Sequence, residues 1–455
     1  MELAGKNVLI VGFERTGEAL CRFLAARGAR VLVTEKKTEA ELAARIAPWR
    51  EKGIAFETSG HRLGSFLGAD LIIPSPGVPP LPEIAAAREK GIPVLSELEL
   101  AARFLRGRVV AITGSNGKST TTALAHKILK EAGLRSRLAG NIGFPLVSFV
   151  ETSRPDHIYV TEVSSFQLEY TERFKADVAA FLNLSQNHLD WHRTFEAYVA
   201  AKKKLFFRLD AGGAAILNRD DPLVWGVAGD TAARVYAFSR KRRPVRGACV
   251  TEGWVELRDG GTERLVRTAR LPLPGTHNQE NVMAAALVGH LLGVPAAAIR
   301  RSVLSFRGLE HRLEDVLRFR GVRFVNDSKA TTVDATLKAL ESFDRPVVLI
   351  LGGRGKGGDF GPLRRAVRAR VRSVVLVGEA APKIESALRD AVPMEAACDY
   401  REVVSKAFAA ARPGDVVLLA PAATSWDMFR NFEERGRTFK REVRRLAAKA
   451  AGRRR

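Results

Sequence analysis

The sequence has few cysteines and no long apolar run, and both absences narrow the class of protein. Three cysteines occur in 455 residues, and none belongs to a Cys-x-x-Cys pair, so neither a disulfide framework nor a thiolate zinc site is indicated. We expect each cysteine to be a small buried or half-buried residue. Apolar runs such as Val347 to Leu351 are far shorter than the roughly 18 to 20 residues that span a bilayer. Since no signal-peptide-like segment opens the chain, we expect a cytoplasmic protein without membrane insertion.

Acidic residues are also scarce. The chain has 50 Asp and Glu against 73 Lys and Arg, a net charge of +23. Such an excess fits nucleic acid, an acidic membrane, or a solvated arginine-rich surface around a phosphorylated substrate. Because the charge is spread along the chain, we favour the last and expect no nucleic-acid partner. The exception is the stretch from Arg435 to Arg455, where Phe439, Val443 and Leu446 recur at the spacing of a terminal amphipathic helix.

The chain is long enough for two or three domains, and its 46% hydrophobic content suffices to build their cores. Three successive blocks each begin with a short β-branched run and continue with helix-period segments. This alternation predicts an α/β protein with mostly parallel, helix-covered sheets. A polar, arginine-rich stretch from Ser239 to Arg270 indicates an irregular or hairpin-rich excursion. The expected strands are Asn7–Val11, Val31–Val33, Ala69–Ile73, Val109–Ile112, Ile158–Thr161, Val178–Leu182, Ala214–Leu217, Val322–Val325, Val347–Leu351, Val374–Val377 and Val416–Leu419.

A candidate phosphate loop runs from Thr113 to Thr120, between an expected strand and an expected helix. Its glycines can bring backbone N–H groups and a helix N-terminus onto phosphates. Lys118 can neutralise phosphate oxygens, and the Ser119 hydroxyl can bind Mg²⁺. Ile112 stands where the usual motif has its first glycine. The alternative is a tight strand-to-helix turn without a ligand.

A second glycine pair, Gly12 and Gly17 with Glu35 beyond the next strand, resembles a dinucleotide fingerprint only superficially. Glu14 replaces the middle glycine, and its carboxylate would crowd a pyrophosphate. Ordinary packing of helix on strand and a nucleotide-sugar site both remain open.

Polar residues follow several other expected strands. Glu162 and His188 could converge beside the phosphate loop as Mg²⁺ ligands, although a histidine after a strand is more often a hydrogen-bonded structural residue. In the last block, three turns could bind carboxylates or phosphates, or be plain loops. These turns are Asn326–Thr331, Gly352–Gly357 and Ala423–Ser425.

With these motifs in order, the chain resembles the Mur ligase family over essentially its full length. The resemblance rests on the phosphate loop together with Gly140–Gly143, Glu162–Glu169, His277–Asn281, His311–Arg312, Asn326–Thr331 and Asn431–Gly436. It implies three domains: a Rossmann-like UDP-sugar domain at 1–98, a central ATPase-type domain with a mostly parallel sheet at 99–308, and a Rossmann-like amino-acid domain at 309–455.

The resemblance also implies a reaction. ATP would convert the carboxylate of UDP-N-acetylmuramoyl-L-alanine into an acyl phosphate, and the amine of D-glutamate would then expel phosphate, in peptidoglycan precursor synthesis. Each step concentrates negative charge, so two Mg²⁺ ions and cationic side chains would be needed to position and neutralise it. A monomer is expected.

Site residues follow from the resemblance by motif. Those implied for ATP are Gly114, Asn116, Gly117, Lys118, Ser119, Thr120, Asn281, Arg312 and Asp327. The implied metal ligands are Ser119, Glu162, His188 and Lys202, the last as a carbamate. Catalytic roles fall to Lys118, His188 and Lys202. The residues implied for the two organic substrates are Ser75, Gly77, Asn141, Lys329, Thr331, Lys356, Ser425 and Phe432. A cation and hydroxyls in that set suit an acidic amino acid.

Two departures from the family pattern and three rival functions remain. The excursion after Ser239 is unusually basic, which we expect to concern only the surface. Arg354 stands where the family often has an acidic residue, which could change the choice of amino acid. A nicotinamide-dependent oxidoreductase would leave Lys118 and Ser119 without a role. A phosphate-loop switch or nucleic-acid-dependent ATPase would not need three anion-binding turns in the last block. A folate polyglutamylating ligase would lack the N-terminal Rossmann-like block.

Overall fold

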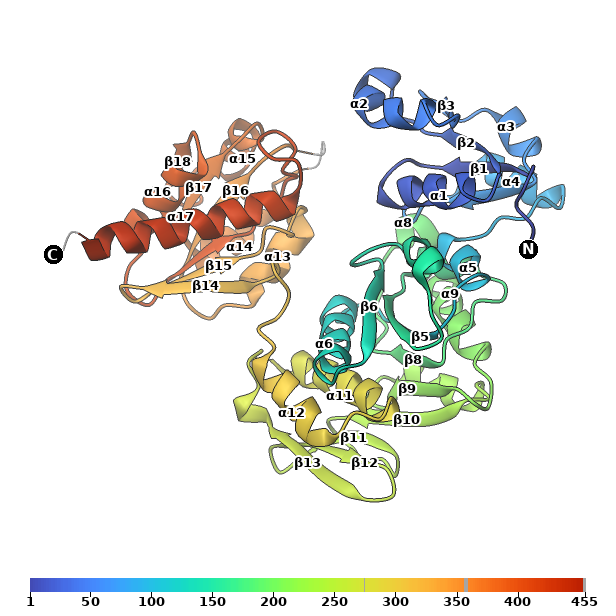
Figure 1. Ribbon diagram of the computed structural model, residues 1–455. Helices are drawn as coiled ribbons and strands as arrows, with labels where there is room; N and C mark the ends of the chain where they lie inside the picture. The colour runs from blue at the N-terminus through green and yellow to red at the C-terminus, as the bar shows by residue number, and fades with distance from the viewer. Residues whose placement is uncertain (274, 356–358, 453–455) are drawn as a thin grey trace. The chain divides into compact units, whose positions relative to one another are not determined.

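The structure is a computed structural model that describes residues 1–273, 275–355 and 359–452. It divides into two compact units, Met1–Phe306 and Arg307–Arg455, and contains three separate β-sheets (Figure 1). Most strand pairs are parallel, and helices cover the sheets. The α/β class predicted from the sequence is therefore confirmed.

The first sheet has four parallel strands in the order β3-β2-β1-β4. Alternate side chains of β1 enter different cores: Val8 and Ile10 pack with α1 and α2, whereas Leu9 and Val11 pack with α3 and α4. Two buried faces explain why the strand is apolar throughout. The elements are β1 Asn7–Val11, α1 Arg15–Ala25, β2 Arg30–Thr34, α2 Glu39–Arg50, β3 Ala55–Glu57, α3 Leu63–Leu67, β4 Leu71–Pro74 and α4 Pro82–Glu89.

The second sheet has nine strands in the order β13-β12-β11-β10-β9-β8-β5-β7-β6. It is parallel from β11 to β6, and an antiparallel meander of β11, β12 and β13 extends one edge. Its strands are β5 Arg108–Thr113, β6 Arg135–Gly140, β7 His157–Glu162, β8 Val178–Phe181, β9 Ala214–Asn218, β10 Arg234–Ser239, β11 Gly247–Thr251, β12 Trp254–Arg258 and β13 Thr262–Arg267. The meander is the hairpin-rich excursion expected after Ser239.

Helices cover both faces of this second sheet. Helices α6, α11 and α12 pack on one face, while α9 packs on the other. The core on the α9 side also contains Val8 and Ile10 of the first sheet, so one continuous apolar cluster joins the two sheets. The helices are α5 Glu97–Ala102, α6 Lys118–Glu131, η1 Leu146–Thr152, α7 Ser165–Glu169, α8 Leu189–His192, α9 Phe195–Phe207, α10 Pro222–Trp225, η2 Gly226–Gly229, η3 Thr268–Arg270, α11 Thr276–Leu291 and α12 Ala296–Ser305.

The second unit contains a six-stranded sheet in the order β14-β15-β19-β16-β17-β18, parallel except for β14. Helices α13, α14 and α15 pack on one face, and α16 and α17 pack on the other. The elements are β14 Glu314–Phe319, β15 Val322–Asn326, α13 Val333–Glu341, β16 Val347–Gly352, α14 Leu363–Arg370, β17 Val371–Val377, α15 Ala381–Leu388, β18 Met394–Ala397, α16 Tyr400–Ala410, β19 Val416–Leu419 and α17 Phe432–Gly452.

The cysteines required one correction. Cys21 and Cys249 are buried as expected, but Cys398 is exposed, in the bend that precedes α16. Burial was the wrong expectation there because the short edge strand β18 ends at Ala397, before this residue. Across the described residues, no helix combines the length and apolar composition needed to cross a bilayer.

Candidate functional site

The phosphate loop connects β5 to α6, as the sequence predicted. Gly117 adopts a left-handed conformation (φ 80°) at the N-terminus of α6, which a glycine tolerates without strain. Lys118 curls back over the loop and donates hydrogen bonds to the carbonyl oxygens of Gly114 and Ser115, both at 2.9 Å. The loop therefore places a cation and a helix N-terminus side by side, a combination that suits a phosphate.

Asn281 of α11 lies against this loop, although it is far from it in sequence. Its Oδ1 accepts a hydrogen bond from the Thr121 hydroxyl at 3.1 Å, and its Nδ2 donates to Asn278 at 3.1 Å. The structure thus brings Asn281 beside Gly117 and Thr121, in the segment that also carries Gly114, Asn116, Lys118, Ser119 and Thr120.

Sequence reasoning missed the residues that brace the loop. Asn183 follows β8; its Oδ1 accepts from the Asn116 amide at 2.8 Å, and its Nδ2 donates to the Asn116 carbonyl at 3.2 Å. Across the loop, the Ser115 and Tyr198 hydroxyls share a hydrogen bond of 2.8 Å. A polar residue at the end of a buried strand was the signal that could have identified Asn183.

Glu162 ends β7 and is 2% exposed. Its Oε1 accepts a hydrogen bond from Asn141 Nδ2 at 2.8 Å. Its Oε2 is buried and has no hydrogen-bond partner among the described residues. A buried polar atom left unsatisfied is costly, and an oxygen ligand for a hard cation would account for it.

Lys202 projects from α9 and is 1% exposed. Its Nζ donates to the Thr113 hydroxyl at 3.1 Å, at the start of the phosphate loop. Burial, followed by the charge of Lys118, holds the pKa of the Lys202 amine well below its ordinary value, and Glu162 opposes that shift. A neutral amine is the form that reacts with electrophiles.

His188 adopts a left-handed backbone (φ 55°) and is exposed. Its ring packs edge-on against Phe166, with centroids 4.7 Å apart, and lies 6.2 Å from the Tyr198 ring. Because Tyr198 also holds Ser115 of the phosphate loop, His188 belongs to the same neighbourhood. A non-glycine residue held at positive φ is a strained feature that functional sites often retain.

A cavity of about 550 Å³ lies within the first unit. Ser75, Gly77 and Asn141, three of the residues proposed for substrate binding, line it. Cationic side chains of Arg15, Lys36 and Lys37 line it too, as do segments of both the first and the second sheet's loops. Its size and charge suit an anionic ligand of nucleotide size.

Glu14 does not crowd this cavity with an unpaired charge. Its carboxylate binds Lys37 Nζ at 2.5 Å and Arg45 Nη1 at 3.1 Å. Burial would raise the Glu14 pKa, but Lys37 and Arg45 outweigh it and lower the pKa overall. Because its charge is paired, the Glu14 carboxylate does not exclude a pyrophosphate from this cavity.

In the second unit, Arg312 and Asp327 lie close together. Asp327 Oδ1 accepts from the Leu313 amide at 3.3 Å. Burial raises the Asp327 pKa to about 6, and Arg312 and Lys329 oppose the shift. Lys329 also lies over the Phe432 ring, with Nζ 5.6 Å from its centroid.

Arg435 ties two of the expected binding turns together, a role that sequence reasoning did not assign. This guanidinium, 1% exposed, donates to the Ser328 hydroxyl and carbonyl at 3.0 and 2.9 Å and to the Ala423 carbonyl at 3.1 Å. Thr331 and Ser425 lie in the two turns so joined. Lys356 lies outside the described residues.

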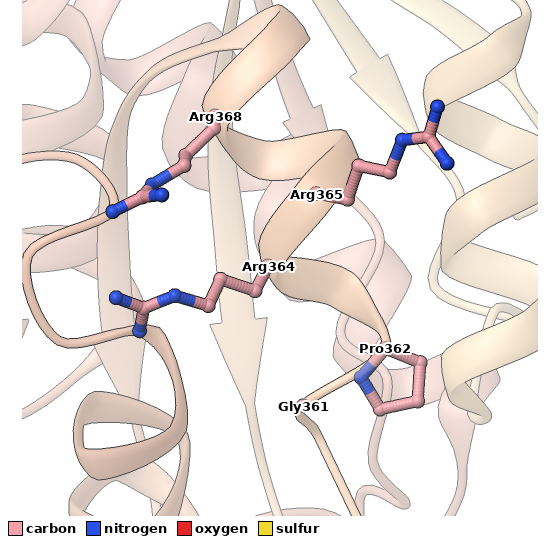
Figure 2. Close-up of a pocket in the computed structure, with 5 residues that line it drawn as sticks. All are labelled: Gly361, Pro362, Arg364, Arg365 and Arg368. Carbon is pink, nitrogen blue, oxygen red and sulfur yellow. The ribbon is translucent and has the colours of Figure 1, made fainter.

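A separate cavity of about 410 Å³ lies on α14 (Figure 2). In Figure 2 the guanidinium groups of Arg364 and Arg368 extend to the same side of the helix, and Arg365 points the other way. Arg364 donates to the Ala387 carbonyl at 3.3 Å, and Arg368 to the Asp390 carbonyl at 3.5 Å. Ala387 lies in the last turn of α15 and Asp390 lies two residues beyond the helix, a region where cations are favourable. These arginines therefore have a structural role.

Comparison with known proteins decides the family. Models for the Mur ligase MurD-like N-terminal domain, the Mur ligase middle domain and the Mur ligase glutamate ligase domain match residues 6–96, 112–289 and 311–423. The chain belongs to the Mur ligase family. This Mur ligase is 48% identical to a UDP-N-acetylmuramoylalanine–D-glutamate ligase of Acidobacterium capsulatum, over 97% of this chain and 96% of the relative. It is 45% identical to the Koribacter versatilis protein of the same name, over 98% and 99%.

Solved structures show the same fold at low sequence identity. The UDP-N-acetylmuramate-alanine ligase of Thermotoga maritima aligns with a TM-score of 0.57 at 18% identity, over 97% of this chain and 100% of that one. A pseudomurein peptide ligase of Methanothermus fervidus gives 0.54, also at 18% identity and with the same coverage. As a Mur ligase, the chain is an ATP-dependent enzyme that forms a carbon–nitrogen bond in peptidoglycan precursor synthesis. The family predicted from its motifs is confirmed.

Proposed function

We propose that this Mur ligase joins D-glutamate to UDP-N-acetylmuramoyl-L-alanine. A carboxylate oxygen of the alanyl group attacks the γ-phosphorus of ATP and ADP leaves. The glutamate nitrogen then attacks the carbonyl carbon and loses a proton, and the acyl oxygen leaves with phosphate. The names of relatives at 40 to 48% identity support this choice of substrates.

The hydrogen bond from Asn141 to Glu162 carries the proposal. Asn141 lines the cavity proposed for the UDP-linked substrate, and Glu162 lies 2% exposed within electrostatic reach of Lys202, which itself touches the start of the phosphate loop. Two hydrogen bonds and one electrostatic interaction therefore link the nucleotide-sugar cavity to the ATP loop. That proximity is what transfer of a phosphoryl group to the substrate's carboxylate demands.

Residues present in the first unit fit Mg²⁺. Glu162 Oε2, which has no hydrogen-bond partner in the described part of the chain, and the Ser119 hydroxyl offer the hard oxygen donors that this ion prefers. We propose Ser119 and Glu162 for one ion, and His188 with carbamylated Lys202 for a second. Mg²⁺ at such a site neutralises charge on phosphate oxygens. Lys118 supplies a further fixed cation beside the same loop.

The second unit supplies groups for the amino acid and for part of the nucleotide. We assign Lys329, Thr331, Lys356, Ser425 and Phe432 to D-glutamate. Two lysines and two hydroxyls can pair with two carboxylates. Arg312 and Asp327 are assigned to ATP together with Asn281 of the first unit. The elevated pKa of Asp327, about 6, places it among the perturbed carboxyl groups that functional sites often contain.

We also propose the domain limits 1–98, 99–308 and 309–455, a monomeric state and a cytoplasmic location. The phosphate loop, Glu162 and Lys202 all come from one chain, so this part of the site needs no second subunit. ATP and a nucleotide-linked substrate support the cytoplasm.

The test is product formation with defined substrates. ADP and phosphate release are measured with ATP, Mg²⁺ and UDP-N-acetylmuramoyl-L-alanine, offering D-glutamate, L-glutamate, D-lysine or no amino acid. Release that requires D-glutamate, with a product heavier by one glutamyl residue, is the expected result. Glu162→Gln should abolish turnover, while Glu172→Gln at an exposed position should not. Turnover with another amino acid alone would overturn the proposed substrate.

A further inference from the structure

Arg354 and Glu379 form a bidentate ion pair at the carboxyl edge of the third sheet. Arg354 follows β16, and Glu379 follows the neighbouring strand β17. Nε of Arg354 donates to one carboxylate oxygen at 2.9 Å and Nη2 donates to the other at 2.8 Å. This hydrogen bonding lowers the Glu379 pKa and raises the Arg354 pKa. Both groups are therefore charged, and the pair adds no net charge.

The pair lies next to a turn that we assign to the amino acid. The Arg354 amide donates to the Thr424 carbonyl at 2.9 Å, and the Thr424 amide donates back at 3.0 Å. Residues that exchange two such bonds have Cα atoms about 5.5 Å apart, and the next Cα, that of Ser425, is about 3.8 Å further along the chain. The Arg354 backbone therefore lies within about 10 Å of that of Ser425.

Acidic charge also gathers at this edge. The Glu379 amide donates to Asp427 Oδ2 at 3.1 Å, so the two carboxylate-bearing residues lie side by side. Asp427 Oδ1 is buried without a hydrogen-bond partner among the described residues. An incoming amino acid with two carboxylates meets repulsion from Glu379 unless a cation compensates for it. Arg354 is the cation that does so.

We propose that Arg354 neutralises Glu379 and that this pairing allows the amino-acid site to accept an acidic side chain. The inference rests on the proposed function, with D-glutamate as the acceptor. It also gives a role to Arg354, the residue at which this chain departs from the family pattern: its positive charge compensates the Glu379 carboxylate.

Opposite effects of the two single substitutions test the proposal. Arg354→Ala leaves the Glu379 charge uncompensated and should raise KM for D-glutamate. Glu379→Ala leaves Arg354 unpaired and should lower it. Since both side chains are about half exposed (50% and 55%), each change should be about two- to fivefold and should shrink at high salt. The double variant should return towards the wild-type KM. We expect kcat and KM for ATP to stay unchanged in all three, as ground-state binding alone is altered.

A matched control lies in the same sheet, at the amino-terminal ends of strands β17 and β19. Arg372 pairs with Asp415 in the same bidentate way, at 2.6 and 3.1 Å. Arg372→Ala should lower the melting temperature without changing KM for D-glutamate. If both single substitutions at the Arg354–Glu379 pair shift KM in the same direction, or not at all, the pair is only structural and the inference fails. If the wild-type enzyme does not use D-glutamate, the proposed function fails and the inference fails with it.

Discussion

Gly117 lies against the side chain of Asn281, so closely that a Cβ atom added at Gly117 would overlap Asn281 Oδ1. The contact joins the phosphate loop to α11, and its partners are 164 positions apart in the chain. Only glycine meets both demands of this position, because the backbone there is also left-handed (φ 80°).

Gly117→Ala should therefore lower the activity of the enzyme with ATP. The new methyl group must displace Asn281 or the loop, and a displacement of about 1 Å at a reacting site can cost about 100-fold in rate. The measurement is kcat/KM for ATP. Gly133→Ala is the control: its φ is +84° and a Cβ there meets nothing within 4 Å. It should cost about 1 kcal/mol of stability and leave kcat/KM unchanged. Equal losses in both variants would refute the role of the Asn281 contact.

Lys202 should carry a carbamate. Its buried amine has a pKa well below the ordinary value because of burial and the nearby Lys118, so a neutral nitrogen is present to attack CO₂ and lose a proton. Protein equilibrated with ¹³C-bicarbonate should show a carbamate carbon signal by NMR. Lys202→Arg should remove the signal and lower kcat by about 100-fold, as expected when a metal site is disturbed. Lys203→Arg, one residue away, should change neither. Full activity in Lys202→Arg would contradict the assignment.

Arg435 should stabilise the second unit. Arg435→Ala removes three hydrogen bonds to Ser328 and Ala423 and leaves their buried acceptors unsatisfied, which should cost about 2 to 4 kcal/mol in the free energy of unfolding. KM for D-glutamate should rise as well, since the two turns lose their common anchor. Arg437→Ala, at an exposed position of the same helix, should change the free energy by less than about 0.5 kcal/mol. Similar urea midpoints for the two variants would argue against this role.

Glu97 should make stability depend on pH. Burial raises its pKa to about 7, although its carboxylate accepts hydrogen bonds from the Val147 and Leu146 amides. The folded state thus binds the proton more tightly than the unfolded state, whose value is 4.5. The associated stability is complete below about pH 4.5 and is lost as pH rises through about 7.

Glu97→Gln has no such proton to lose. Its melting temperature should match that of the wild type near pH 5 and exceed it near pH 8, with a difference in free energy of up to about 3 kcal/mol. Differential scanning calorimetry across this range provides the measurement. A constant difference between the two proteins at every pH would show that Glu97 does not titrate in this window.

The parallel strands could be predicted because each is marked by a short run of apolar, β-branched residues that are neighbours in the sequence. A run such as Val347 to Leu351 is apolar and β-branched, and it becomes β16, buried on both faces. The short or polar edge strands β3, β14 and β18 were not predicted, since their place depends on pairing with a neighbour rather than on their own composition.

The same distinction applies to the candidate site. Glycines, a lysine and hydroxyls in a row predicted the phosphate loop, and the polar ends of strands predicted Glu162. Asn183 and Arg435 were missed because their partners are distant: Arg435 and Ser328 are 107 positions apart. A hydrogen bond over that separation leaves no pattern in a single sequence.

By itself the sequence determined the succession of three α/β blocks, the position of the phosphate loop and the family, because each depends on neighbouring residues or on an ordered set of motifs. Only the tertiary structure decided which charged side chains are paired with an opposite charge or buried. Glu14 and Arg354 looked like free charges in the sequence, yet Lys37, Arg45 and Glu379 neutralise them. Lys202 is the first of three consecutive lysines in the sequence, yet it is 1% exposed. Pairing and burial are properties of the folded chain, since both require segments far apart in sequence to meet.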